Sequence, residues 1–240
     1  MDLLITGHSR GIGAALCDYY LEHDARVFGV SRTQRATAVA GLCEYRCDFS
    51  EPETIASALD ALIPAGATPE LVFLNAGILG PIAPMRELSL SELREVLDVN
   101  VWANKAILDW LQARSTHPKQ IVLLSSGASH SGHVGWGAYA LSKAALNMLA
   151  QLYAREMTDT HLCALAPGLV DTGMQTALRT YSADAFPSLG RLHAAAGTDA
   201  MPTPDTAARR IAESCPALLQ TPSGGFVDLR NFLPQVGTAG

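Results

Sequence analysis

Short apolar runs alternate with longer segments of helical periodicity along most of the 240-residue chain. Apolar residues at helical spacing predict helices around Gly11–Glu22, Pro52–Ile63, Ser89–Ala113 and Gly137–Met157. Strands that alternate with helices are typical of an α/β fold, and here we expect one doubly wound domain over residues 1–240, a seven-stranded parallel sheet with helices on both faces. The apolar runs that predict these buried strands are Leu3–Thr6, Arg26–Ser31, Glu44–Cys47, Leu71–Asn75, Ile121–Ser125, Leu162–Ala166 and Gly225–Asp228.

One region departs from this alternation. Residues 176–204 mix Gly, Pro, Ser and Ala without a clear period. A long, loop-rich insert is often an active-site lid. We therefore expect this segment to cover the substrate side of a site, with a solvated excursion that has no role as the alternative.

Composition narrows the class of protein. Hydrophobic residues make up 48% of the chain and charged residues 17%, which is typical of a globular domain. A net charge of −6 argues against a nucleic-acid-binding surface. No apolar run approaches the roughly 20 residues of a membrane span, and the first strand begins at residue 2, so we expect neither a membrane segment nor a signal peptide.

The five cysteines form no CxxC pair and no metal-ligand framework, so we expect no metal site. Cys43 and Cys47 flank the third predicted strand, where filling the core is the simplest role. This use of cysteine fits a reducing, cytoplasmic setting.

The stretch TGHSRGIG joins the first predicted strand directly to the first predicted helix. Glycines at such a junction let a ligand approach the backbone, and the helix N-terminus offers free N–H groups to an anion. A tight turn that simply needs glycine is the alternative. The candidate phosphate-binding residues are Gly7, Ser9, Arg10, Gly11, Ile12 and Gly13.

Ligands of a doubly wound, Rossmann-type sheet bind outside the carboxyl ends of the strands. In this sequence, residues able to do chemistry follow one predicted strand end after another. Beyond the glycine-rich turn they are Ser31 and Arg32, Asp48, Asn75 to Gly77, Ser125 and Ser126, and Pro167 with Gly168.

Taken together, these motifs closely resemble the short-chain dehydrogenase/reductase family over essentially the full length. TGHSRGIG is similar to that family's TGxxxGxG turn, and LNAG to its fourth-strand signature. SSGASHSGHVGWGAYALSK carries its Ser, Tyr and Lys. Within the family, GWGAYALSKAALNM, PGLVDTGMQ and GGFVDLRNF look nearest to the sepiapterin reductases and bacterial benzil reductases, which implies NADPH-dependent reduction of a dicarbonyl or a pterin side-chain ketone.

Tyr139 and Lys143 are four residues apart on a predicted helix and so share one face. A phenol titrates near pH 10, and we expect the ammonium to lower the pKa of Tyr139 towards the working pH of an acid–base catalyst. An ordinary amphipathic helix is the alternative. The resemblance implies that Ser126, 13 residues before Tyr139, binds the substrate carbonyl, while Ser125 is structural. It also implies that Asn100 kinks its helix and holds a water that links Lys143 to solvent; a buried, satisfied polar residue is the other reading.

The residues after the second strand indicate which nicotinamide cofactor binds. NAD-dependent enzymes place a carboxylate there for the ribose 2′-hydroxyl, whereas this chain has Ser31 and Arg32, with Arg10 in the glycine turn. Arginine forms bidentate, charge-assisted bonds with phosphate. We therefore expect NADPH/NADP+, with solvated surface arginines as the alternative.

The resemblance assigns further contacts to this cofactor. Asp48 would contact the adenine, beside Phe49, unless it only caps the following helix. Asn75, Ala76 and Gly77 would pack along the ribose and midsection. The nicotinamide end would be held by Pro167, Gly168, Val170 and Thr172, next to Tyr139 and Lys143.

On the substrate side, Ser126 is joined by two candidates. Trp136 either forms a wall of the pocket or serves packing only. Asp228 matches the residue that anchors the pterin in sepiapterin reductases, although a salt bridge with Arg230 is the competing account. The resemblance also implies a homodimer or homotetramer that pairs the helices Ser89–Ala113 and Gly137–Met157.

We thus expect an NADPH-dependent carbonyl reductase with Tyr139 as proton donor and a small-molecule carbonyl substrate. Two alternatives stay open, a catalytically silent NADP(H)-binding regulator and an alcohol dehydrogenase that works in the oxidative direction. The intact Ser-Tyr-Lys set speaks against the first, and an NADPH preference against the second. A nucleotide-sugar epimerase is disfavoured by the glycine-turn spacing and the length of 240 residues.

Overall fold

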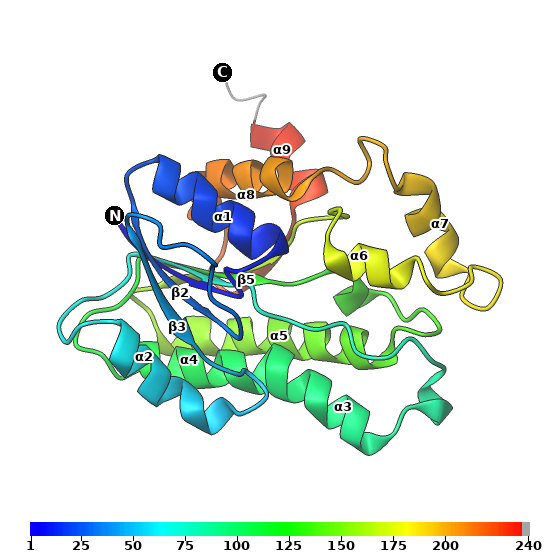
Figure 1. Ribbon diagram of the computed structural model, residues 1–240, viewed down its shortest axis with the longest axis horizontal. Coiled ribbons are helices and arrows are strands. Elements are labelled where there is room, and N and C mark those ends of the chain that lie inside the picture. Colours follow the sequence, from blue (N-terminus) through cyan, green and yellow to red (C-terminus); the bar gives the residue numbers. More distant parts are fainter. Residues whose placement is uncertain (237–240) are drawn as a thin grey trace.

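The computed structural model describes residues 1–236 and builds them around one parallel sheet (Figure 1). Residues 237–240 of the predicted domain lie outside the described residues. The strand order is β3-β2-β1-β4-β5-β6-β7, which confirms the seven-stranded, doubly wound, Rossmann-type prediction. The strands are β1 (Asp2–Thr6), β2 (Arg26–Ser31), β3 (Leu42–Arg46), β4 (Leu71–Leu74), β5 (Gln120–Leu124), β6 (His161–Ala166) and β7 (Gly225–Asp228).

Helices cover both faces of this sheet. One face carries α1 (Gly11–Glu22) packed beside α8 (Pro204–Leu218), with α9 (Leu229–Val236) next to them (Figure 1). The other face carries α2 (Ile55–Leu62), α4 (Ala103–Gln112) and α5 (Gly137–Glu156), and α3 (Leu90–Leu97) packs on α5. The remaining helices, α6 (Gly173–Leu178) and α7 (Ser188–Ala195), lie beyond the carboxyl ends of the strands (Figure 1).

The two helical layers produce two apolar cores. Along β1, Leu3 and Ile5 pack on the α1 and α8 side, while Leu4 packs on the α4 and α5 side. All three side chains are fully buried. Successive side chains of a strand point to opposite faces of the sheet, and helices cover both faces. A strand covered on both faces therefore reads as a continuous apolar run rather than an alternating one.

The structure corrects three expectations. The single helix expected over Ser89–Ala113 is two helices joined by a π-helical turn, Asp98–Trp102. The 176–204 segment contains the end of α6 and all of α7, so it is not irregular throughout. Cys43 is exposed because it lies on the edge strand β3, whereas Cys47 is buried as expected.

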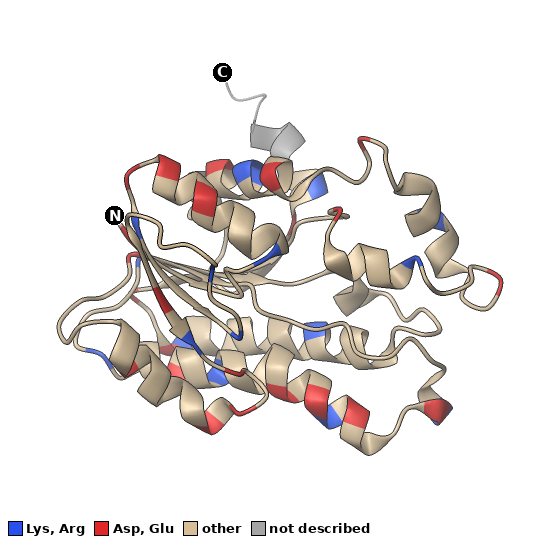
Figure 2. Cartoon of the chain, in the orientation of Figure 1, with Lys and Arg blue, Asp and Glu red and all other residues tan. Residues whose placement is uncertain are grey.

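Charges are distributed over the surface elements without a continuous basic stripe in the coloured part of the chain (Figure 2). Within residues 1–236, no helix combines the length and apolar character needed to cross a bilayer. The same residues hold no cluster of three or more metal-binding side chains.

Candidate active site

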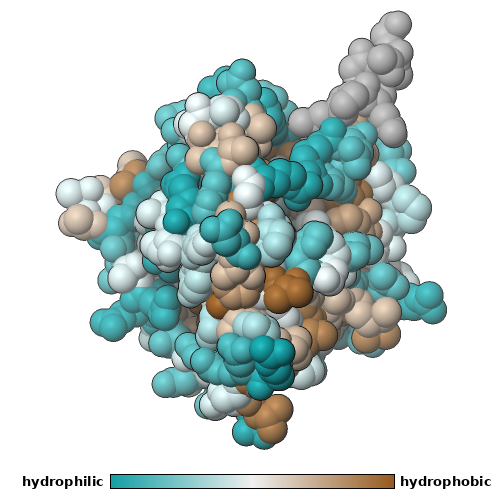
Figure 3. Space-filling view, turned by 90° about the vertical axis from the view of Figure 1, so that its right-hand side faces the viewer, coloured by the Kyte–Doolittle hydropathy of each residue, from teal (hydrophilic) through white to brown (hydrophobic). Residues whose placement is uncertain are grey.

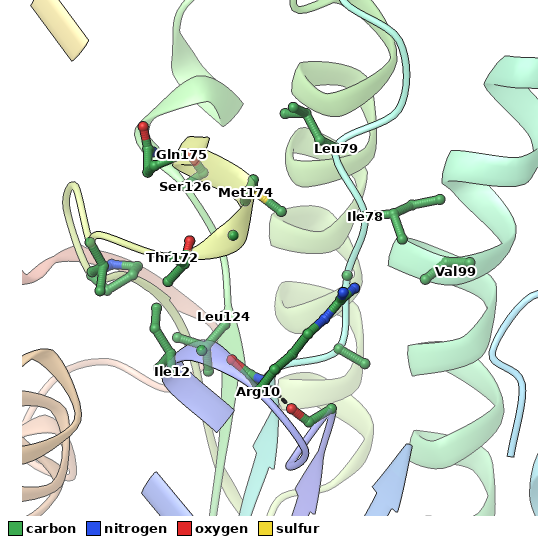
Figure 4. A pocket seen from close by; sticks show the side chains of 18 of the residues that line it. Arg10, Ile12, Ile78, Leu79, Val99, Leu124, Ser126, Thr172, Met174 and Gln175 are labelled. Carbon is green, nitrogen blue, oxygen red and sulfur yellow. Dashed lines mark hydrogen bonds between the residues drawn. The ribbon is translucent and has the colours of Figure 1, made fainter. Parts of the chain in front are cut away.

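A pocket of about 790 Å³ opens at the carboxyl ends of the strands. It lies where the strand order reverses, between β1 and β4, which is where doubly wound sheets bind ligands. Figure 3 faces this side of the molecule and shows apolar residues among polar ones. Figure 4 shows the pocket between the glycine-rich turn, with Arg10 and Ile12, and the segment that carries Ile78 and Leu79.

The glycine-rich turn provides the phosphate-sized end of this pocket. Gly7 and Gly11 have positive φ angles of 68° and 56°, which glycine adopts without strain. A Cβ at Gly13 would lie 2.2 Å from the Gly7 carbonyl oxygen and 2.4 Å from Nδ2 of Asn75, so no side chain fits there. The first intrahelical bond is donated by the Ala14 N–H, which leaves the N–H groups of the preceding three residues available to an anion. The turn therefore fits a dinucleotide pyrophosphate.

Most of the predicted site residues line this one pocket. Gly13, Asn100, Trp136 and Asp228 do not. Those that do are Gly7, Ser9, Arg10, Gly11, Ile12, Ser31, Arg32, Asp48, Phe49, Asn75, Ala76, Gly77, Ser126, Tyr139, Lys143, Pro167, Gly168, Val170 and Thr172.

Tyr139, Lys143 and Ser126 meet at the far end from the glycine turn. Tyr139 and Lys143 lie one turn apart on α5, and Nζ of Lys143 is 5.6 Å from the centre of the Tyr139 ring. That ammonium donates a 2.7 Å hydrogen bond to the Leu124 carbonyl at the end of β5. Ser126 follows two residues later, and its Oγ accepts from the Ala128 N–H. The strand end and the helix thus fix the three polar groups around one point.

Burial dominates the ionisation of this group. It raises the pKa of Tyr139 to about 12, although a hydrogen bond with Ser126 acts in the opposite direction. It lowers the pKa of Lys143 to about 8. The expected depression of the Tyr139 pKa by Lys143 is therefore wrong for the protein alone, because burial withdraws the phenol from water and disfavours its charged form.

Asn100 is fully buried in the π-helical turn. Its Oδ1 accepts from the Ile78 N–H at 2.8 Å, and its Nδ2 donates to the Ile78 carbonyl and to Oγ of Ser142, each at 2.9 Å. The side chain therefore ties the segment after β4 to α5. A Cβ on Gly77 would lie 3.1 Å from Oδ1 of Asn100 and 3.5 Å from Nζ of Lys143, so this glycine lets the backbone pass close to the catalytic end. The water-holding role of Asn100 stays a prediction.

At the opposite end, hydroxyl and guanidinium groups gather around the loop after β2. Ser31 Oγ donates to the Thr33 carbonyl, and Ser9 and Thr33 share a 3.0 Å hydrogen bond between their hydroxyls. Arg10 and Arg32 are exposed and line the same end, and Arg10 extends from the turn into the pocket (Figure 4). This end is rich in donors that suit an additional phosphate.

Asp48 makes two hydrogen bonds that involve Ser50. Its Oδ1 accepts from the Ser50 N–H at 3.0 Å and from the Ser50 hydroxyl at 2.9 Å. These bonds hold the pKa of Asp48 below its usual range. The carboxylate thus organises the turn before α2 while it lines the pocket, so the capping and adenine-binding readings are compatible.

The two substrate-side candidates, Trp136 and Asp228, are not among the residues that line the pocket. Trp136 donates from Nε1 to Oγ of Ser188 at 2.8 Å and so ties α7 to the start of α5. Asp228 accepts from Nε and a terminal nitrogen of Arg230, at 2.9 and 2.5 Å, and this ion pair lowers the pKa of Asp228. This is the salt bridge with Arg230 that we expected as the alternative to substrate binding. An anchoring role for Asp228 stays a prediction.

The structure adds pocket residues that the sequence patterns left without a role. Several of them directly follow a predicted motif in the sequence, and this adjacency could have indicated that they line the pocket. They are Thr33, Ile78, Leu79, Val99, Leu124, Leu169, Gly173, Met174, Gln175 and Ala177. Ser125, for which we expected a structural role, lines the pocket as well. Ser125 itself donates to Oδ1 of Asn147 and holds the strand end against α5.

Comparison with known proteins finds close counterparts. The family model described as short chain dehydrogenase matches residues 2–183. A benzil reductase ((S)-benzoin forming) of Bacillus subtilis (strain 168) is 30% identical over 96% of this chain and 98% of its own length. A benzil reductase ((S)-benzoin forming) of Saccharomyces cerevisiae is 33% identical over 74% of each chain. Among solved structures, the KRED1-Pglu enzyme is similar at a TM-score of 0.81 and 25% identity, over 94% of this chain and 99% of its own.

Proposed function

The chain belongs to the short-chain dehydrogenase family, and we propose that it is an NADPH-dependent carbonyl reductase that adds hydride to a ketone or dicarbonyl substrate. Family membership makes it an oxidoreductase of carbonyl and hydroxyl groups. The main support for an NADPH-dependent carbonyl reductase is that a single pocket is lined both by the glycine-rich turn and by Ser126, Tyr139 and Lys143.

When bound, the reduced nicotinamide supplies the hydride. The chain's own residues supply position and a proton. The Ser126 hydroxyl binds the substrate carbonyl oxygen and stabilises the charge that develops on it. The Tyr139 phenol, kept protonated by burial, gives its proton to that oxygen. Lys143, held by the Leu124 carbonyl, places a positive charge beside the Tyr139 ring and favours the phenolate that remains.

The cofactor preference rests on the end of the pocket that faces the loop after β2. Arg10, Arg32 and the hydroxyls of Ser9, Ser31 and Thr33 line it. The residues that directly follow β2 include no carboxylate to bind a ribose 2′-hydroxyl or repel a 2′-phosphate. This donor-rich end supports NADPH over NADH.

Two similar chains support the substrate class. The Bacillus subtilis and Saccharomyces cerevisiae proteins are benzil reductases by name. Benzil, a dicarbonyl with two apolar rings, is therefore the first substrate to test. The resemblance to sepiapterin reductases makes sepiapterin the second.

We further propose a homodimer or homotetramer in the cytoplasm. Leu141, Met148 and Leu152 are each about half exposed and lie at helical spacing on one face of α5. A second copy that covers this face would remove these apolar side chains from water. The free cysteines support a reducing location.

Initial rates of NADPH and NADH oxidation against benzil, a small aliphatic diketone and sepiapterin test the proposal, with Tyr139→Phe as the blank. We expect turnover with NADPH that the variant loses, and a rise in KM for NADPH but not NADH in Arg32→Ala. Tight NADPH binding without turnover would favour the regulator. A preference for NADH would contradict the assignment of Arg10 and Arg32.

A further inference from the structure

Gln175 places a side-chain amide at the substrate end of the pocket. It lies on α6, just beyond the loop after β6, and lines the pocket together with Met174. Figure 4 places both side chains, like Ser126, at the end of the pocket away from Arg10 and Ile12. The amide therefore lines the same end of the pocket as Ser126, which would bind the reacting carbonyl.

No hydrogen bond joins this amide to a protein group within residues 1–232, the part of the chain whose side chains the structure describes. Neighbouring side chains in the sequence do form hydrogen bonds. Arg179 donates to the Thr176 hydroxyl at 3.1 Å and to Asp171 at 3.0 Å. The Gln175 side chain, partly buried, makes no such bond. A substrate that covers it removes a donor and an acceptor from water, which is costly unless the substrate itself bonds to them.

Apolar side chains make up much of the rest of the pocket wall. Leu79, Leu169, Met174 and Ala177 line the pocket together with Gln175. Methionine adapts its shape to a neighbour and makes favourable contacts with aromatic rings. Gln175 thus places a polar amide among side chains that fit hydrocarbon or aromatic groups.

We infer that the Gln175 amide N–H binds the second carbonyl oxygen of a vicinal diketone with apolar substituents, while Ser126 and Tyr139 bind the first. This inference rests on the proposed function. In the reaction, the π bond of the first carbonyl breaks, its carbon gains the hydride and its oxygen gains the Tyr139 proton. The product is an α-hydroxy ketone. The second carbonyl is unchanged and stays bonded to Gln175.

Benzil and deoxybenzoin form a matched pair of probes, because they differ only in the second carbonyl. The wild type, Gln175→Leu and Gln220→Leu are compared, Gln220 being an exposed glutamine beyond α8. The readouts are kcat/KM with NADPH and equilibrium binding of each ketone in the presence of NADP+. Circular dichroism and NADPH binding check that each variant is folded.

We expect Gln175→Leu to lower the benzil-to-deoxybenzoin ratio about tenfold, the effect of one lost hydrogen bond, in both readouts. Gln220→Leu leaves the ratio at its wild-type value. An unchanged ratio in Gln175→Leu, or an equal loss for both ketones, overturns the inference. If the wild type reduces neither ketone, the proposed function fails. The binding ratio then tests the inference by itself. A lower ratio in Gln175→Leu supports the role of Gln175, and an unchanged ratio overturns it.

Discussion

Nε2 of His8 lies 2.5 Å from Oε1 of Glu44, and this contact joins the glycine-rich turn to β3. His8 is fully buried. The same Glu44 oxygen accepts from the Arg35 N–H at 3.1 Å, and the Arg35 guanidinium bonds to Asp18 and to the Ala14 carbonyl of α1. This series of polar contacts thus connects the glycine-rich turn, β3, the loop after β2 and α1.

We predict that His8→Ala weakens both stability and NADPH binding. It leaves the part-buried Glu44 carboxylate with the Arg35 N–H but without its histidine partner, which costs about 1–3 kcal/mol of unfolding free energy, and it loosens the loop that carries Arg32. We expect the Kd for NADPH to rise several-fold, and more than the Kd for NADH. Urea unfolding and cofactor titration measure these effects. Glu44→Gln keeps an acceptor for His8 and Arg35, so it serves as the milder matched variant; equal losses in both variants would argue against the role given to the carboxylate.

Gly13→Ala is predicted to disrupt the phosphate-binding turn. Its methyl group would overlap the Gly7 carbonyl and the Asn75 amide, both held by neighbouring strands. Overpacking of this kind costs about 1–3 kcal/mol, and the displaced turn should bind NADPH at least tenfold more weakly. Gly132→Ala is the control, because nothing lies within 4 Å of its added methyl group. Wild-type affinity in Gly13→Ala would contradict the proposed pyrophosphate position.

Lys143 makes the stability of the cofactor-free protein depend on pH. Burial lowers its pKa to about 8, whereas an unfolded lysine titrates near pH 10.4. Between these values the unfolded chain holds a proton that the folded chain has released. The unfolding free energy therefore rises with pH across this window.

Lys143→Met removes this titration. We expect the unfolding free energy of the wild type, measured relative to this variant, to increase by about 2 kcal/mol from pH 7 to pH 10. Urea unfolding without cofactor at pH 7, 8.5 and 10 gives the two curves. Lys119→Met, at an exposed lysine, should run parallel to the wild type. If Lys143→Met also runs parallel, the ammonium is not buried as the structure has it.

The strands and most pocket residues were predictable because both follow from local patterns. Leu3, Leu4 and Ile5 form an apolar run since both faces of β1 are covered, and polar residues after each strand end must share one edge of the sheet. The resemblance implied a kink at Asn100, but its form as a π-helical turn was not predictable. It depends on bonds between Asn100 and residues far away in the sequence, Ile78 and Ser142.

Side-chain direction explains the remaining differences. Gly13 belongs to the phosphate turn, yet it packs against the Gly7 backbone rather than lining the pocket. Trp136 points to Ser188 and Asp228 to Arg230. Gln175 was part of a quoted motif, but only the path of α6 over the pocket gives it a role. The spacing of residues along the sequence does not predict these side-chain contacts.

The exposed face of α5 leads to a last prediction. Leu141, Met148 and Leu152 leave about half of each side chain in water, and a carboxylate placed among them would be desolvated and unpaired when two copies meet. We expect Leu152→Glu to shift the protein from a dimer or tetramer to a smaller species, measured by light scattering during gel filtration. Val134→Glu, at an apolar residue that is 62% exposed and lies outside both expected interface helices, should keep the wild-type mass. A wild-type protein that runs as a monomer at all concentrations would remove the proposed assembly.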